Sequence, residues 1–195
     1  MNINLKIADA INDSINTKKL LLETQAKKIE EIGILIAKQV KLGNKVLFCG
    51  NGGSAADSQH LAAELVVRLR SHYNRPAIPG LALTVDTSIL TAGGNDIGFD
   101  NIFARGVEAF GQKGDVLIGI STSGKSENVI RAVNLANEKG LVTVGLLGGD
   151  GGKLNEYCNH SVIVPSNVTA RIQESHILIG HIWCEIIEEF CYPMD

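Results

Sequence analysis

The sequence predicts an α/β fold, a three-layer sandwich whose central parallel sheet of about five strands is flanked by helices and preceded by an N-terminal helical arm. Two observations carry this prediction. After Gly43, short apolar runs alternate with longer segments of helical spacing, which is typical of parallel strands joined by helices. The chain has 195 residues, of which 45% are hydrophobic, and this is enough to fill one core. We therefore expect one domain over 1–195.

The expected elements follow in chain order. Apolar residues recur at helical spacing over 3–42, with no glycine before Gly33, which predicts two helices forming an arm over 1–43. Apolar runs predict strands at 45–49, 80–85, 115–120, 141–147 and 161–164. Helices are expected at 54–70, 99–110, 126–139, 151–157 and 169–190. Because ligands bind beyond the carboxyl ends of strands in such sheets, functional residues are expected just after each run.

Composition excludes several classes of protein. The net charge is −3 and no basic run interrupts the mixture of charges, so a nucleic-acid partner is not favoured. No stretch approaches the roughly 18 apolar residues that cross a bilayer, and the first residues lack the apolar core of a signal peptide. These features predict a soluble cytoplasmic protein with no membrane partner. The four cysteines form no C-x-x-C pair and are expected to be free, buried thiols: Cys49, Cys158, Cys184 and Cys191.

A glycine-rich loop follows the first predicted strand, in the order Gly50, Asn51, Gly52, Gly53, Ser54. Small residues let the backbone approach a ligand, and the free N–H groups at a helix N-terminus favour an anion. The alternative is a tight turn before a helix capped by Ser54 with Asp57. The loop also matches the dinucleotide fingerprint G-x-G-x-x-A, but Asp86 lies too far along the chain to contact a ribose.

A second loop, after the third predicted strand, carries four hydroxyl groups around one glycine: Ser121, Thr122, Ser123 and Ser126. Hydroxyl and backbone N–H groups together can hold one phosphate. From Gly119 the segment also reads as a nucleotide-binding P-loop, G-x-x-x-x-G-K-S. We expect Gly119 to lie inside the strand, which leaves too short a loop for a triphosphate, so a monophosphate is favoured over a nucleotide. A solvated turn is the alternative.

Acid–base candidates lie on two predicted helices. His60 and Glu64 are four residues apart on one helix face, among apolar neighbours, so they should be paired, liganded or shifted in pKa. A hydrogen bond without chemistry is the alternative. The last helix offers several further candidates, among them Gln173 and His181, but these two are eight residues and about 12 Å of rise apart. Spacing alone does not select that pair.

Four segments together resemble the phosphoheptose isomerase family of sugar isomerase (SIS) domain proteins: FCGNGGSAADSQHLAAEL (48–65), GNDIGFDNIFARGVEAFG (94–111), ISTSGKSENVI (120–130) and TARIQESHILIGHIWCE (169–185). The resemblance implies conversion of sedoheptulose 7-phosphate to D-glycero-D-manno-heptose 7-phosphate, a precursor of the heptoses in bacterial surface polysaccharides such as lipopolysaccharide. It implies phosphate binding by Ser121, Thr122, Ser123 and Ser126, and sugar contacts from Asn51, Gly52, Gly53, Ser54, Asn95, Asp96 and Gln173. Glu64 resembles the family's general base and His181 its general acid.

The resemblance also implies a zinc ion held by His60, Glu64, Gln173 and His181. If Glu64 and His181 both bind zinc, neither is at the same moment a free base or acid. Either the metal is displaced by the substrate or it polarises the carbonyl group as a Lewis acid, and the sequence leaves both open. The family is usually a homotetramer with sites at subunit contacts. Arg68 is a candidate contact to substrate or to a neighbouring chain, with an exposed solubilising charge as the alternative.

Three other functions share parts of this pattern. A regulator that binds the replication initiator protein has the same fold, but it has no need of the acid–base pair Glu64 and His181. A sugar-phosphate-sensing transcription factor would carry a DNA-binding head, and residues 1–44 contain no recognisable helix-turn-helix. A P-loop nucleotidase would bind ATP with magnesium.

Overall fold

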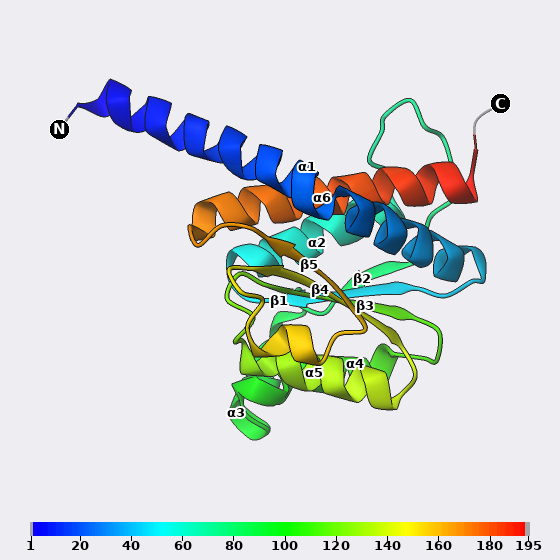
Figure 1. Cartoon of the computed structure of the whole chain (residues 1–195). Coiled ribbons are helices and arrows are strands. Elements are labelled where there is room, and N and C mark those ends of the chain that lie inside the picture. Colours follow the sequence, from blue (N-terminus) through cyan, green and yellow to red (C-terminus); the bar gives the residue numbers. More distant parts are fainter. Residues whose placement is uncertain (1, 194–195) are drawn as a thin grey trace.

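The computed structural model describes residues 2–193 of the chain. A five-stranded sheet, with every neighbouring pair parallel, forms the middle layer. Its strands are β1 (Val46–Gly50), β2 (Gly80–Ala82), β3 (Val116–Ser121), β4 (Val142–Gly148) and β5 (His160–Val164). Helices cover both faces (Figure 1). The predicted three-layer α/β fold is therefore confirmed.

The helices divide between the two faces of the sheet. The two long helices α1 (Ile3–Lys41) and α6 (Thr169–Cys191) pack on one face together with α2 (Gly53–Val66). On the other face lie α3 (Thr87–Asp96), α4 (Ile102–Phe110) and α5 (Glu127–Glu138), with the short 3₁₀ helices η1 (Phe99–Asn101) and η2 (Lys153–Glu156). Among residues 2–193, no helix combines the length and apolar character needed to span a membrane.

Alternate residues along the strands build two separate cores. In β1, for example, Val46 and Phe48 face the layer of α1, α2 and α6, whereas Leu47 and Cys49 face α4 and α5. The three central strands, β1, β3 and β4, are buried almost throughout because both of their faces are covered. This explains why the strands read in the sequence as continuous apolar runs.

The strand order β2-β1-β3-β4-β5 determines where a ligand crevice lies. The chain leaves β1 toward one edge of the sheet and leaves β3 toward the other, so the order reverses between these two neighbours. Their following loops diverge into α2 and α5, which lie on opposite faces. In open α/β sheets, ligands bind at this reversal point. Here it is flanked by the glycine-rich loop after β1 and the serine-rich loop after β3.

The arm differs from the prediction. Instead of two helices, residues 3–41 form one continuous α-helix, capped by the Asn2 side chain. Gly33 does not interrupt it and lies in close contact with α6: a β-carbon there would lie 2.7 Å from Ile186 and 3.0 Å from Trp183. The Trp183 indole also donates a hydrogen bond to the Ile29 carbonyl. Packing against α6 thus offsets the low helix propensity of glycine.

Other boundaries shift for local reasons. The second strand ends at Ala82 rather than residue 85, and Asp86 caps a helix that the prediction missed, α3, by accepting a hydrogen bond from the Ile89 N–H. Helix α2 ends at Val66 rather than residue 70. The predicted helix at 151–157 is the single 3₁₀ turn η2, and η1 opens the predicted helix at 99–110.

Candidate active site

The glycine-rich loop connects β1 directly to α2. Gly52 occupies the N-cap position with φ +55°, a conformation that favours glycine, and no side chain caps the helix. The capping interpretation of Ser54 with Asp57 is therefore wrong: Ser54 lies inside the first turn, is 4% exposed and packs beside Gly50. The helix N-terminus thus presents backbone N–H groups rather than a side-chain cap.

The predicted sugar contact Asn51 is held by a residue from the second loop. Its side-chain amide exchanges two hydrogen bonds with that of Asn128 in the first turn of α5, at 2.8 and 2.9 Å. Asn128 is 2% exposed, so this pair is largely shielded from water. The two amides join the loops that follow β1 and β3 across the reversal point of the sheet.

The serine-rich loop lies between β3 and α5 as predicted. Gly119 is inside β3, paired with Cys49 of β1, so the formal P-loop match does not form a phosphate-wrapping loop. Thr122 and Ser123 line a cavity of about 350 Å³. Ser121 and Ser126 instead bond to each other through their hydroxyl oxygens, 3.0 Å apart. Two of the four predicted phosphate residues therefore line this cavity, and the other two form a hydrogen-bonded pair next to them in the chain.

The acid–base candidates come together from two helices. His60 Nε2 lies 3.3 Å from Glu64 Oε1 on α2 and 2.9 Å from His181 Nε2 on α6. The three ligand atoms all lie within 4.8 Å of one another. Glu64 is half-buried, with 17% of its side chain exposed, and His60 is more open at 49%. The predicted meeting of residues 64 and 181, which are distant in sequence, is present within one chain.

This cluster is a group that can hold a metal ion. A direct hydrogen bond between the two histidines requires one ring to donate and the other to accept, whereas a shared cation uses lone pairs on both. Zinc bound at about 2.0 Å in a tetrahedron separates its ligands by about 3.3 Å. The distances of 2.9 and 3.3 Å between the donor atoms are near that separation. Two imidazole nitrogens and a carboxylate oxygen are also donors that zinc prefers.

The close packing of α2 on α6 brings this cluster together. Gly180, directly before His181, lies against Leu61, which directly follows His60: a β-carbon on Gly180 would be 2.5 Å from the Leu61 side chain. Leu61 is 1% exposed. One glycine thus allows the two helices to approach at the point where both carry ligand atoms.

Gln173 lies elsewhere on α6. Its side-chain amide fills the space beside Gly53, where a β-carbon would overlap it. Gly53 precedes His60 by seven residues, about 10 Å of helix rise, so Gln173 lies toward the loop end of α2. This position brings Gln173 to the glycine-rich loop, and its role as a fourth metal ligand stays a prediction.

Within one chain, the remaining predicted substrate residues are not part of the cluster of His60, Glu64 and His181. Arg68 is exposed in the loop after α2. Asn95 and Asp96 end α3 in the layer on the other face of the sheet, where the Asn95 amide donates a hydrogen bond to the Asp96 carboxylate at 2.6 Å. All three stay predictions as substrate contacts.

Comparison with known proteins places this chain in a family. Residues 11–148 match the family described as SIS domain. The phosphoheptose isomerase of Clostridium acetobutylicum is 54% identical over 92% of this chain and 91% of that protein. The chain belongs to the phosphoheptose isomerase family. Phosphoheptose isomerase 2 of Campylobacter jejuni is 50% identical over 96% of this chain and 94% of that protein.

Solved structures of phosphoheptose isomerases have the same architecture. The enzyme from Neisseria gonorrhoeae superposes with a TM-score of 0.90 at 41% identity, covering 96% of this chain and 100% of that one. The enzyme from Francisella tularensis gives 0.93 at 37% identity, covering 97% and 100%. The sugar isomerase domain of an RpiR transcription factor from Sphaerobacter thermophilus, at 19% identity and a TM-score of 0.61, shares the fold alone. The alternative of a replication regulator gains no support from these phosphoheptose isomerases.

Sequence reasoning missed several residues that line the same cavity as Thr122 and Ser123 in this member of the phosphoheptose isomerase family. The cavity is also lined by Lys125, Gly148, Gly149, Asp150, Asn167, Thr169 and Ile172. Most of them follow β4 and β5, so the rule that ligands bind at the carboxyl ends of strands pointed to this region. No motif marked them individually. Asp57 was considered only as a cap, yet its Oδ2 is buried without a partner and burial raises its pKa.

Proposed function

We propose that this chain catalyses the isomerisation of sedoheptulose 7-phosphate to D-glycero-D-manno-heptose 7-phosphate. The observation that carries the proposal is the convergence of Glu64 with His60 and His181 from α2 and α6. The first turns of the same α6 line the hydroxyl-bearing cavity, through Thr169 and Ile172. One helix therefore contributes both to the hydroxyl-lined cavity and to the acid–base group, with Gln173 between them in the sequence.

The proposed chemistry moves one proton between neighbouring carbons. The Glu64 carboxylate takes a proton from C1 of the ketose, and the C1–H electrons form the double bond of an enediol. His181 gives a proton to the C2 carbonyl oxygen at the same stage. Return of a proton to C2 and loss of the O1 proton then give the aldose. A carboxylate and an imidazole held on facing helices are suited to these two transfers.

The hydroxyl-lined cavity and the loops would hold the substrate during this transfer. Thr122 and Ser123 at the cavity wall, supported by Ser121 and Ser126, would bind the phosphate group. The lining also holds Lys125, whose ammonium group can pair with phosphate, and Asp150, whose negative charge opposes that of phosphate. The N–H groups of the glycine-rich loop and the Gln173 amide would contact the sugar hydroxyls. Anchoring the phosphate places the other end of the chain, with its carbonyl group, at the acid–base residues.

We also propose zinc as the resident metal. His60, Glu64 and His181 would hold it, with Gln173 as a fourth ligand if its side chain turns away from Gly53. When bound, zinc would supply a Lewis acid that polarises the substrate carbonyl, and this would replace the proton from His181 while that histidine is a ligand. Because a carboxylate has two oxygens, Glu64 can face His60 with Oε1 while Oε2 serves as the base.

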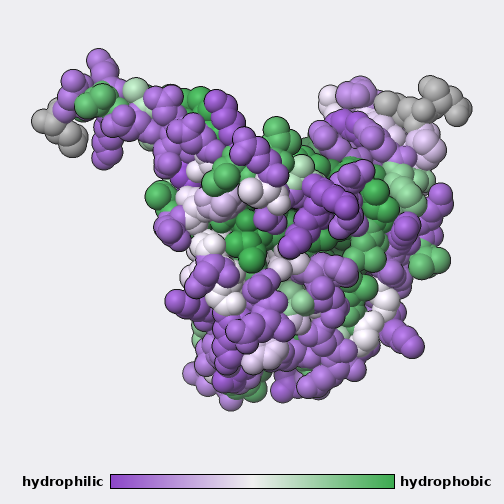
Figure 2. Space-filling view, viewed as in Figure 1, coloured by the Kyte–Doolittle hydropathy of each residue, from purple (hydrophilic) through white to green (hydrophobic). Residues whose placement is uncertain are grey.

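The apolar surface of α1 supports the proposal that copies of the chain assemble into a homotetramer with sites near subunit contacts. Ile7, Ile11 and Ile15, four residues apart on one helix face, are 53%, 56% and 45% exposed. Figure 2 shows apolar residues on the projecting part of this helix and on the body beside it. Such a stripe is typical of a helix that packs against a partner. Light scattering should give four chains per particle, and Ile7→Glu with Ile11→Glu should dissociate it.

The decisive experiment is incubation with sedoheptulose 7-phosphate in heavy water. The proposal predicts that the aldose forms with one deuterium at C2. Mass spectrometry would detect the deuterium and NMR would locate it. An aldose without solvent deuterium would mean either that Glu64 returns the C1 proton to C2 before it exchanges with solvent or that hydride is transferred directly; loss of turnover in Glu64→Gln would favour the first. Absence of any aldose, with the same protein shown to be folded, would refute the proposed substrate.

A further inference from the structure

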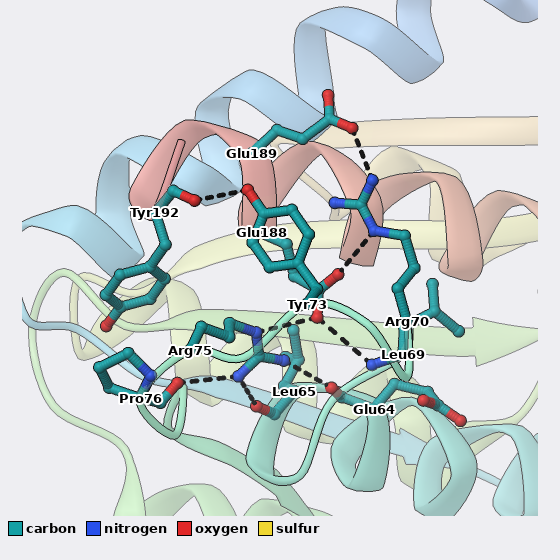
Figure 3. A network of polar contacts seen from close by, with 10 residues as sticks. All are labelled: Glu64, Leu65, Leu69, Arg70, Tyr73, Arg75, Pro76, Glu188, Glu189 and Tyr192. Carbon is teal, nitrogen blue, oxygen red and sulfur yellow. Dashed lines mark hydrogen bonds and ion pairs between the residues drawn. The ribbon is translucent and has the colours of Figure 1, made fainter. Parts of the chain in front are cut away.

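A buried ion pair connects the loop after α2 to the C-terminal half of α6. Arg75 Nε donates to Glu188 Oε1 at 2.9 Å, and the side chains are 1% and 0% exposed (Figure 3). Burying a charged pair is costly unless its remaining hydrogen-bonding groups are also satisfied. The other hydrogen-bond partners of the Arg75 guanidinium and of the Glu188 carboxylate therefore show which parts of the fold this ion pair joins.

The other side of the Arg75 guanidinium contacts the end of α2. Nη2 donates to the Glu64 carbonyl at 2.8 Å, and Nη1 donates to the Leu65 carbonyl at 2.8 Å and to Pro76 at 2.9 Å. The last carbonyls of a helix have no N–H partner within the helix. Arg75 thus caps the turn of α2 that carries the proposed base. The planar fork of arginine reaches α2 and Glu188 together, which the single ammonium group of lysine does not.

Glu188 also accepts hydrogen bonds from two residues of the loop after α2 other than Arg75. Its Oε1 accepts a hydrogen bond from the Leu69 N–H, and its Oε2 accepts one from Arg70 Nε at 3.1 Å. Arg70 also pairs with Glu189 and lies over the Tyr73 ring, 4.3 Å from its centroid. Arg70 therefore shares Glu188 with Arg75, but it contacts α6 and its own loop rather than the carbonyls of α2.

Glu188 follows His181 by seven residues, which is two turns along one face of α6. We infer that Arg75 is a positioning residue for the isomerase site: by joining the Glu64 carbonyl to Glu188, it sets the separation of the helix turns that carry Glu64 and His181. This inference rests on the proposed roles of those two residues. Gly180 against Leu61 fixes how closely the helices approach, and Arg75 fixes the end of α2 beyond that contact.

The test compares Arg75→Lys with Arg70→Lys. Both substitutions keep a positive charge near Glu188, but only the first removes the fork on the α2 carbonyls. Arg75→Lys should lower kcat by about tenfold to a hundredfold with little change in KM, because a displacement of about 1 Å at the reacting group has effects of that size. It should weaken zinc binding by about tenfold, measured by competition with a chromophoric chelator in the absence of substrate. Arg70→Lys should leave both values near those of the unchanged protein.

A second variant covers the case in which Arg75→Lys does not fold. Arg75→Gln with Glu188→Gln removes both buried charges together and should reproduce the loss of kcat and of zinc affinity. Wild-type kcat and zinc affinity in a folded variant lacking the Arg75 fork would overturn the inference, since the ion pair would then act on stability alone. If the unchanged protein does not isomerise the heptose phosphate, the proposed function fails, and the zinc titration still decides whether Arg75 positions the cluster.

Discussion

Replacing Gly180 with alanine tests whether close approach of α6 to α2 builds the acid–base cluster. The new β-carbon would lie 2.5 and 2.6 Å from the two terminal carbons of Leu61 and 3.1 Å from its Cγ, compared with 3.4–4 Å for ordinary contact. Leu61 or its helix must therefore move by about 1 Å, and Leu61 has no free space because it is 1% exposed. His60 and Glu64, which this displacement would move, lie near Leu61 on α2.

Two effects on stability oppose each other in this variant. Overpacking of a filled core costs about 1–3 kcal/mol. Replacing glycine by alanine inside a helix returns about 1 kcal/mol of helix propensity. We therefore expect Gly180→Ala to lower the free energy of unfolding by up to about 2 kcal/mol, which leaves the protein folded. Turnover should fall more sharply, by about tenfold to a hundredfold, because the displaced helix carries Glu64.

A double-mutant cycle measured by urea unfolding isolates the contact. Leu61→Ala alone should cost about 2–5 kcal/mol through the cavity it leaves. In that background the methyl group of Gly180→Ala occupies part of the cavity, so the same substitution should become neutral or stabilising. An equal cost of Gly180→Ala in both backgrounds would refute the reasoning. Gly106→Ala is the matched control, since its β-carbon would meet Leu83 less closely, at 3.2 Å, and turnover should be unchanged.

Three further predictions concern the acid–base group, the proposed phosphate site and pH. Glu64→Gln keeps the shape but removes the base, so turnover should be abolished while equilibrium binding of substrate persists; undiminished turnover would exclude Glu64 as the base. Ser121→Ala with Ser123→Ala should raise KM by about tenfold or more, since hydrogen bonds to charged groups contribute about 1.5–3 kcal/mol each, and an unchanged KM would mean that the phosphate site is misplaced. Burial lowers the pKa of His176 from 6.5 to about 4, so the unfolded chain binds a proton that the folded chain does not, and stability falls as pH falls through that window. The free energy of unfolding, measured in urea at pH 7 and at pH 4.5, should fall between the two by about 2–3 kcal/mol less in His176→Gln than in the unchanged protein. An equal fall in both proteins would contradict this account of His176.

Periodicity predicted most of the fold because both faces of the sheet are covered. The central strands are buried on two sides, so they stand out as apolar runs between helical segments. Helix α3 escaped prediction because its sequence contains Gly93 and Gly94, and none of its residues is buried. The arm was divided in two because the packing of Gly33 against α6 is a contact between residues about 150 positions apart, which no local pattern contains.

The candidate site was predictable only where its residues are neighbours along the chain. His60 and Glu64 share one helix face, so their pairing follows from spacing. The choice of His181 as their partner came from family resemblance, because the packing of α2 on α6 cannot be derived from spacing. Asn128 was missed for the same reason, since its partner Asn51 is 77 residues away and no motif connects the two.

The length of α1 has a consequence for handling the protein. At about 1.5 Å per residue, its 39 residues extend roughly 58 Å, while its buried side chains begin only at Thr17. In the proposed tetramer, neighbouring copies would cover the preceding turns, so dilution that separates the copies would leave them open to proteases before the body of the protein is cut. Cleavage near the N-terminus would then report dissociation, and assays at very low protein concentration would underestimate specific activity.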